Sequence, residues 1–397
     1  SIQTEDDEVQ PKSRNRIQFD FKEHRVHQFK TFLPNEEESR PLNALADYIP
    51  IEKIEHGIIY TRDHRYIKVL EVIPVNFLLR SAQEQRSIIY SFISYLKIAP
   101  AKVQFKVLTK KADIDRHVEA VRKELEHETD PHCRRLQEDY LNLIQQIGSR
   151  EAITRRFFLI FEHEPLPGTK RGHEDEEAVA ALQTAARTAA NYLRQCGNSI
   201  VTSNEEDEAT AEVLFHILCR KESTGRTFSQ KAKQIITDYI AAGRSIDSIP
   251  SNEFYAPSTI DFSHGRYICI DGLYYAYLLV PSDGYKAQVP AGWLSLIVNA
   301  GDGIDMDMFL ARQPKDRMIR KLGQQLRINR SKIKEASDTN TDFDDLDGAI
   351  RSGYFLKDGL GNNEDFYYLN LLITVTAESV EDLDWKCAEL KKLLVSQ

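Results

Sequence analysis

The fold is decided by the stretch Gly57-Ile-Ile-Tyr-Thr-Arg-Asp-His-Arg-Tyr-Ile-Lys-Val-Leu-Glu-Val-Ile73, which Pro74 closes. Its second arm places Ile67, Val69, Glu71 and Ile73 on one face and Leu70 and Val72 on the other. This alternation, rich in β-branched residues, is typical of a strand. The stretch therefore predicts a β-hairpin.

Helices and strands are expected to follow the hairpin as far as residue 164. Ser81 and Glu84 have the spacing of a capping box, which predicts a helix that Pro100 ends. A strand is expected over 103–107, a long polar helical stretch over 112–148 and an apolar strand over 157–161.

The same order of elements recurs about two hundred residues later. A second hairpin is expected over 267–280, and its Asp271-Gly272 dipeptide favours a type I′ turn. A short helix (293–298), a strand (304–311), a polar helical stretch (315–356), an apolar strand (367–376) and a terminal helix follow. We expect an α+β fold of two similar modules, an internal duplication with mixed sheets flanked by helices.

The module boundaries follow from this repeat. We expect a flexible tail (1–44), a first module (45–223) with a helical arm (112–148), a helix and linker (224–258), and a second module (259–397). The first module has a short strand at 199–202 with no counterpart in the second. The second module is therefore expected to be truncated, as in a piece of a longer protein.

The helical arm is expected to be an antiparallel helix pair, because Pro131 divides it. Its apolar positions follow one another at three- and four-residue steps. They are Val118, Val121, Leu125, Leu136, Tyr140, Leu143 and Ile147. Two acidic segments, Asp338–Gly348 and Asp358–Asp365, are expected to be loops in the second module.

The N-terminal tail contains aromatic residues in a basic setting: Phe19, Phe21, Phe29 and Phe32. They favour either a disordered tail that packs on the first module or a partner-docking segment that orders on binding. The net charge of −9 argues against broad nucleic-acid binding. No apolar run is long enough to span a bilayer, so we expect membrane contact only through partners.

Sequence motifs for catalysis or metal binding are weak. The dipeptide Gly-Lys is absent, so there is no phosphate-binding P-loop. The five scattered cysteines form no zinc pattern. The acidic run at Asp338 fails as a calcium loop, because Phe343 stands where glycine is required. Asp305 and Asp307 share a strand face, for which an exposed face is the simplest interpretation and a metal-dependent hydrolase a minor alternative. We predict no catalytic, cofactor-binding or metal residues in this chain.

Several segments resemble one protein family. They are Ala46–Pro50, Gly57–Pro74, Asn76–Arg80, Leu96–Pro100, Val103–Asp113, Leu136–Tyr140 and Gly148–Phe158. They look like the N-terminal region of the large ATPase of type IV secretion systems (the VirB/TraC/TrbE type), in the form carried by conjugative elements of Gram-positive bacteria. The resemblance is specific over about 45–162 and extends less distinctly to Gln397.

The resemblance implies a non-catalytic scaffold that positions a C-terminal motor on a membrane channel complex. ATP and Mg²⁺ would bind only in that motor, and the parent protein would be a homo-oligomeric ATPase at the inner face of the cell membrane, held there by its partners. The alternative is a self-contained nucleic-acid- or peptide-binding module. Its candidate base-stacking residues are Tyr274, Tyr275, Tyr277, Tyr367 and Tyr368.

Overall fold

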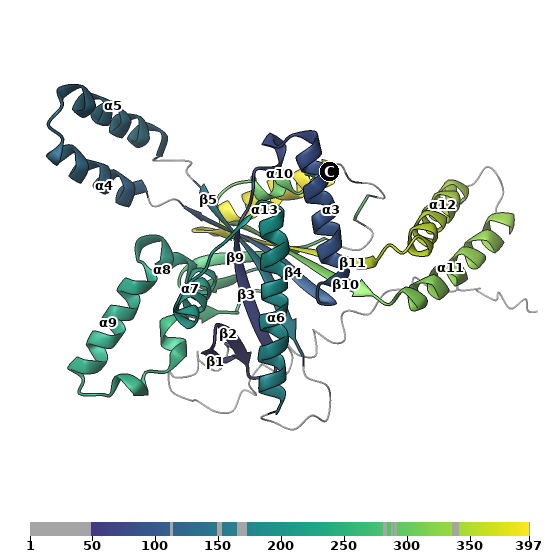
Figure 1. Ribbon diagram of the computed structural model, residues 1–397, viewed down its shortest axis with the longest axis horizontal. Coiled ribbons are helices and arrows are strands. Elements are labelled where there is room, and N and C mark those ends of the chain that lie inside the picture. The colour runs from purple at the N-terminus through teal and green to yellow at the C-terminus, as the bar shows by residue number, and fades with distance from the viewer. Residues whose placement is uncertain are drawn as a thin grey trace, which may run out of the picture. The chain divides into compact units, whose positions relative to one another are not determined.

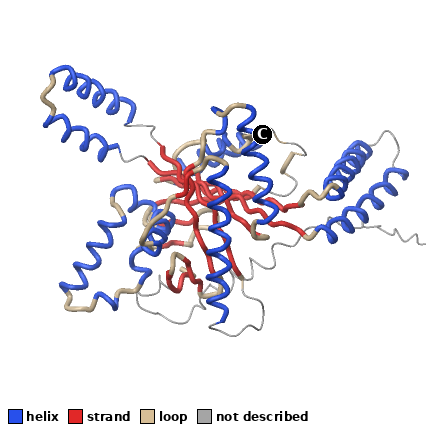
Figure 2. Tube along the Cα trace, viewed as in Figure 1, coloured by secondary structure: helices blue, strands red, loops and turns tan. Residues whose placement is uncertain are grey.

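One antiparallel β-sheet organises the part of the chain that the computed structural model describes. That part comprises residues 49–111, 114–148, 153–164, 173–280, 284–286, 289, 292–335 and 341–396. The expected α+β class is confirmed, with helices packed on an eleven-stranded sheet of the described residues (Figures 1 and 2). Where we expected mixed sheets, each of its strand pairs is antiparallel.

Both predicted modules contribute strands to the sheet. In the first they are β1 (Ile51–Glu55), β2 (Ile58–Thr61), β3 (Tyr66–Ile73), β4 (Lys102–Lys111), β5 (Ile153–His163) and β6 (Ser199–Ile200). In the second they are β7 (Ile260–Asp261), β8 (Ile268–Ile270), β9 (Leu273–Leu279), β10 (Ile304–Gln313) and β11 (Phe366–Ala377).

The strand order reads alike from both edges: β1-β2-β3-β5-β4, then β10-β11-β9-β8-β7, with β6 beside β3. The two halves join through β4 and β10, where Val107 lies opposite Met306. Both modules therefore share one sheet within the unit 49–397. The matching order is what a duplication would produce, although element order alone does not establish common descent. The duplication and the module boundaries stay predictions.

The hairpin turn predicted at Asp271-Gly272 forms there. Asp271 and Gly272 both have positive φ, 49° and 74°, as a type I′ turn requires. A second turn of this kind joins β1 to β2, with φ of 56° at His56 and 65° at Gly57. Glycine at 57 also permits close approach of α7, since a Cβ there would lie 2.8 Å from Glu206 Cβ.

The helices pack on both faces of the sheet or extend from it. In the first module and its following segment they are η2 (Phe77–Leu79), α3 (Ala82–Ile98), α4 (Ile114–His127), α5 (Pro131–Gly148), α6 (His173–Gln195), α7 (Glu206–Leu218), α8 (Arg220–Gly225), α9 (Phe228–Ala241), η3 (Ile246–Ser248) and η4 (Ser251–Phe254). The second module adds α10 (Ser295–Val298), α11 (Lys315–Glu335), α12 (Thr341–Gly361) and α13 (Val380–Ser396).

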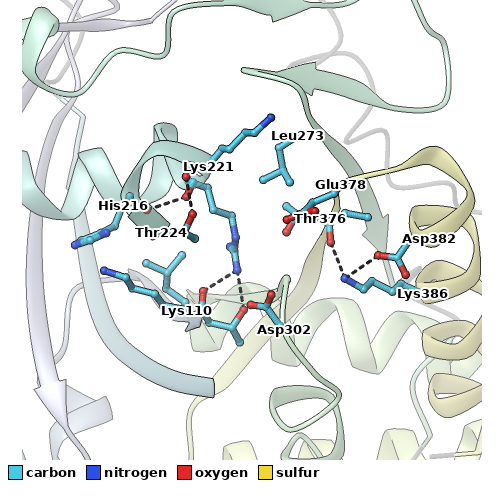
Figure 3. Close-up of a pocket in the computed structure, with 15 residues that line it drawn as sticks. Lys110, His216, Lys221, Thr224, Leu273, Asp302, Thr376, Glu378, Asp382 and Lys386 are labelled. Atoms are coloured by element: carbon cyan, nitrogen blue, oxygen red, sulfur yellow. Dashed lines mark hydrogen bonds and ion pairs between the residues drawn. The ribbon is translucent and has the colours of Figure 1, made fainter. Parts of the chain in front are cut away.

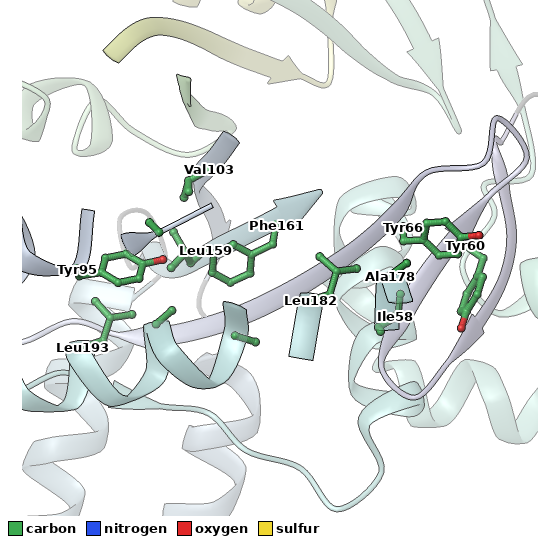
Figure 4. Packing of buried hydrophobic residues seen from close by; sticks show 13 residues of the cluster. Ile58, Tyr60, Tyr66, Tyr95, Val103, Leu159, Phe161, Ala178, Leu182 and Leu193 are labelled. Carbon is green, nitrogen blue, oxygen red and sulfur yellow. The ribbon is translucent and has the colours of Figure 1, made fainter. Parts of the chain in front are cut away.

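Two apolar clusters cover one face of the sheet. In the first half, Tyr95 of α3 and Leu182 of α6 pack against Leu159 and Phe161 of β5 (Figure 4). In the second half, Leu383 of α13 likewise packs against buried side chains of β11. On the opposite face, Val213 of α7 packs on Leu108 and Phe158, the neighbour of Leu159. This is the alternation expected of a strand buried on both faces.

The helical arm forms as an antiparallel pair, and α5 begins at Pro131, the residue expected to divide it. The apolar positions of the arm divide between buried and exposed faces. Val118, Val121 and Leu125 of α4 pack against Leu141 of α5, whereas Leu136, Tyr140 and Leu143 are exposed. The reason is that 136, 140 and 143 lie on a different face of the helix from 141.

A second helix pair, α11 and α12, occupies the corresponding place between β10 and β11. Because β4 and β10 are antiparallel, the two pairs leave the sheet at opposite ends of these strands. The expectation of loops was wrong over 341–348 and 358–361, because α12 spans Thr341–Gly361, whereas residues 362–365 do form a turn and loop before β11. Tertiary packing of α12 on α11, through Leu326 beside Gly353, overrides the low helix propensity of this acidic run.

Candidate functional site

The predicted docking residues Phe19, Phe21, Phe29 and Phe32 lie outside the described residues. Two other features of the fold can be examined as sites. One is a cluster of buried charges where β4 meets β10. The other is an exposed apolar surface around α3.

Asp305 of β10 lies at the centre of the buried charge cluster, with 4% of its surface exposed. Its Oδ1 accepts hydrogen bonds from the Thr109 amide at 2.8 Å and the Thr109 hydroxyl at 3.0 Å. Its Oδ2 accepts from Nη1 of Arg220 in α8. Nη2 of Arg220 donates to the Thr109 carbonyl at 2.6 Å. This network connects β4, β10 and α8.

Asp307 is equally buried, two residues further along β10. Its Oδ1 accepts from the side-chain Nε2 of Gln104 at 2.7 Å, and its Oδ2 accepts from Nζ of Lys106 at 2.9 Å. Both partners belong to β4, across the junction between the halves. The two aspartates therefore do share a face, as the sequence indicated, but that face is not exposed.

These contacts leave the two carboxylates little chemistry to perform. Each oxygen already accepts a hydrogen bond, and each negative charge is matched by a buried or half-buried cation. A general base or metal ligand needs lone pairs directed at the reacting group or the ion. Within the described residues, no group of three or more His, Cys, Asp or Glu side chains could hold a metal ion. We interpret the cluster as a structural clasp between the halves.

Sequence reasoning missed Arg220 and Lys106 as partners of these aspartates. A signal was present, because two aspartates alternating with Met306 and Met308 in an apolar strand require buried cations if that strand is central. Nothing local identifies which cations, since Arg220 is 85 residues and Lys106 is 201 residues away.

A cavity of about 250 Å³ lies beside the clasp (Figure 3). Its lining includes Lys110 and Lys221 from the first module and Asp302 and Lys386 from the second. Lys386 is engaged, since its Nζ lies 3.2 Å from Asp382 and donates to the Thr376 carbonyl. The volume is below the roughly 300–1,000 Å³ typical of small-molecule sites. The cavity marks the seam between the modules.

The five tyrosines proposed to stack bases form no common platform. Tyr275 is buried, and desolvation raises the pKa of its hydroxyl. Tyr367 donates to the Leu96 carbonyl at 2.8 Å, and Tyr368 accepts from Nζ of Lys321 at 3.1 Å. Of the five, only Tyr277 is exposed, over about half of its surface. The arrangement gives no support to the nucleic-acid-binding alternative.

Exposed apolar residues gather in the segment from η2 to the end of α3. Leu78 and Leu79 are 83% and 82% exposed, and Tyr90 is 69% exposed. Ile89 and Ile93 are about half exposed on the same side of α3 as Tyr90. The predicted capping box begins this helix, with the Ser81 amide donating to Glu84 Oε2 at 2.9 Å and the Glu84 amide donating to Ser81 Oγ at 3.3 Å.

Comparison with protein families matches residues 52–215 to the archaeal TraC-like domain. The chain carries a TraC-like domain. This match supports the resemblance to TraC-type conjugative-transfer proteins seen in the sequence. A search of curated proteins found no match.

The TraC-like domain coincides with the first half of the sheet. It begins in β1, ends in α7, and contains α3, α6 and the α4–α5 arm. The exposed surface of α3 therefore belongs to the TraC-like domain. Arg220 and Asp305 lie beyond its end, in the part of the chain that completes the sheet. Among the residues described, no helix is long and apolar enough to cross a membrane.

Proposed function

We propose that this chain is the docking and scaffold region of a conjugative DNA-transfer ATPase of the type IV secretion class. It positions a motor domain on the membrane channel complex and does not hydrolyse ATP itself. The TraC-like match over residues 52–215 carries this proposal. Channel components, the parent's own motor and further copies of the parent are the partners we propose.

Two features of the described residues support a scaffold. The buried pairs Arg220–Asp305 and Lys106–Asp307 hold both modules in one sheet, so that force applied to one half is passed to the other. The two helix pairs, α4–α5 and α11–α12, leave the sheet at opposite ends of β4 and β10. They offer two separate contact surfaces to partners.

Catalytic silence is supported by the absence of a P-loop from the sequence. Isothermal titration of the purified chain with ATP and Mg²⁺ tests this part of the proposal. We expect no heat of binding beyond dilution. A stoichiometric site of micromolar affinity would overturn it.

Docking is tested with membranes from cells that express the transfer machinery and from cells that lack it. The purified chain should co-sediment more with the former, and unlabelled chain should displace labelled chain. Equal binding to both membranes would contradict docking on channel components, whatever the titration shows.

A further inference from the structure

Helix α3 is apolar on both of its faces. The inner face contributes Tyr95 and Phe92 to the core against α6 and the sheet. The outer face carries Ile89, Tyr90 and Ile93, all exposed, and Leu78 and Leu79 of η2 are exposed just before it. Apolar side chains gathered on an exposed helix face commonly mark a contact with a partner or a membrane. No described residue packs over Ile89, Tyr90 and Ile93 closely enough to bury them.

The charges around this surface are opposite in sign to those of the whole chain. Residues 72–101 carry Arg80, Arg86 and Lys97 and a single acid, Glu84, which lies 3.6 Å from Arg80 and accepts from Ser81. The end of α6 that packs on α3, together with the turn and β6 that follow it (residues 185–203), carries two arginines and no acid. The chain as a whole has a net charge of −9.

The two arginines of α6 lie on its exposed side. Arg187 and Arg194 are seven residues apart, which places them on one face of the helix, and both are exposed. The opposite face of α6 contributes Ala186, Ala189 and Leu193 to the core. Both α3 and α6 pack on the same side of the sheet, where they form one outer layer (Figure 1).

We propose that this outer layer binds directly to an anionic lipid bilayer. Exposed leucine, isoleucine and tyrosine side chains bordered by Lys and Arg are the composition of interfacial helices, which insert apolar groups among the acyl chains and pair cations with anionic headgroups. The bilayer accounts for both the apolar exposure and the local positive charge. The inference goes beyond the proposed function, which requires only protein partners.

The expected size of each contribution can be stated. Each cation near an anionic surface adds about 1 kcal/mol, or about fivefold in affinity. Arg86→Gln together with Arg187→Gln should therefore weaken binding about 25-fold. Leu78→Gln together with Leu79→Gln should weaken it at least about tenfold, because the burial of each leucine contributes more than a kcal/mol.

The test is co-sedimentation of the full chain with vesicles of phosphatidylcholine, alone or mixed with phosphatidylglycerol. We expect binding to the mixed vesicles, weakened by salt, and little binding to phosphatidylcholine alone. Leu136→Gln and Arg135→Gln, at exposed positions on α5, are the matched controls and should bind like the wild type. All substituted positions are exposed, and circular dichroism verifies the fold of each variant.

Two results would overturn the proposal. One is failure of the wild-type chain to bind anionic vesicles, which would assign the surface to a protein partner. The other is binding that the α3 and α6 substitutions leave unchanged, which would place lipid contact elsewhere on the chain. Neither result affects the co-sedimentation with machinery-containing membranes by which docking is judged.

Discussion

The guanidinium of Arg220 in α8 donates to the carboxylate of Asp305 in β10, and both side chains are buried. Arg220 also donates to the carbonyl and hydroxyl oxygens of Thr109 in β4. One arginine thus contacts both central strands of the sheet. Because β4 belongs to the first module and β10 to the second, this contact stabilises the junction that holds both modules in one sheet.

Removing one partner of this pair should destabilise the whole fold. Asp305→Asn leaves Arg220 buried without its counter-charge, and we expect a loss of about 3–5 kcal/mol in the free energy of unfolding. Urea denaturation followed by circular dichroism measures it. Asp384→Asn breaks the exposed Arg266–Asp384 pair and should cost less than about 1 kcal/mol. Equal effects of the two changes would contradict the clasp.

The aspartates should not bind divalent metal. All their oxygens are occupied by Thr109, Arg220, Gln104 and Lys106, so a cation would have to displace buried positive charge. We expect Mn²⁺, Mg²⁺ or a chelator to leave the melting temperature unchanged, since a ligand of the folded state alone would raise it. A rise with Mn²⁺ that Asp307→Asn abolishes would restore the metal-site hypothesis.

The buried thiol of Cys219 should be unreactive. Burial raises the pKa of Cys219 to about 11, and the nearby Lys231 only partly offsets this. Because the thiolate is the reactive form, alkylation near neutral pH should reach the exposed Cys133 first, as followed by mass spectrometry. Comparable labelling of Cys133 and Cys219 in the folded chain would contradict the burial of Cys219. The unfolded chain, in which both thiols are exposed, is the control.

The raised pKa of Cys219 also gives a pH dependence. Between its ordinary pKa of 9.0 and about 11, the folded state keeps a proton that the unfolded thiol loses. The contribution of this group to stability is complete below that window and declines as the pH rises through it. Cys219→Ala should therefore flatten the alkaline end of the stability profile, whereas Cys133→Ala should leave it unchanged.

The start of α3 offers a test of the capping box. Ser81→Ala removes the acceptor for the Glu84 amide, and we expect a loss of about 1 kcal/mol in the free energy of unfolding. Ser94→Ala, in the exposed middle of the same helix, removes only a bond to the Tyr90 carbonyl and should have no destabilising effect. Equal losses would show that the cap contributes nothing.

Local sequence signals predicted the elements well and their assembly poorly. The capping box at Ser81, the turn at Asp271-Gly272 and the break at Pro131 each depend on residues close in sequence. The pairing of β4 with β10 joins Val107 to Met306, and no local pattern specifies it. The exposure of Leu136 could not be predicted for a related reason, since spacing identifies a helix face without identifying what covers it.

The same limit applies to the candidate site. Sequence reasoning found that Asp305 and Asp307 share a face, because strand periodicity guarantees it. It could not find that the face is buried, since their cations come from other elements. The exposed surface of α3 was not predicted either, because apolar spacing along a helix does not show which positions stay uncovered.

The central claim is that this chain occupies the docking sites of a conjugative motor without supplying its activity. The most direct test is the frequency of DNA transfer from a donor whose transfer ATPase carries the same TraC-like region, with this chain overproduced. Competition for docking sites should lower transfer severalfold, and a donor with an unrelated transfer system should be unaffected. Undiminished transfer, with the chain shown to be abundant and folded, would contradict the account.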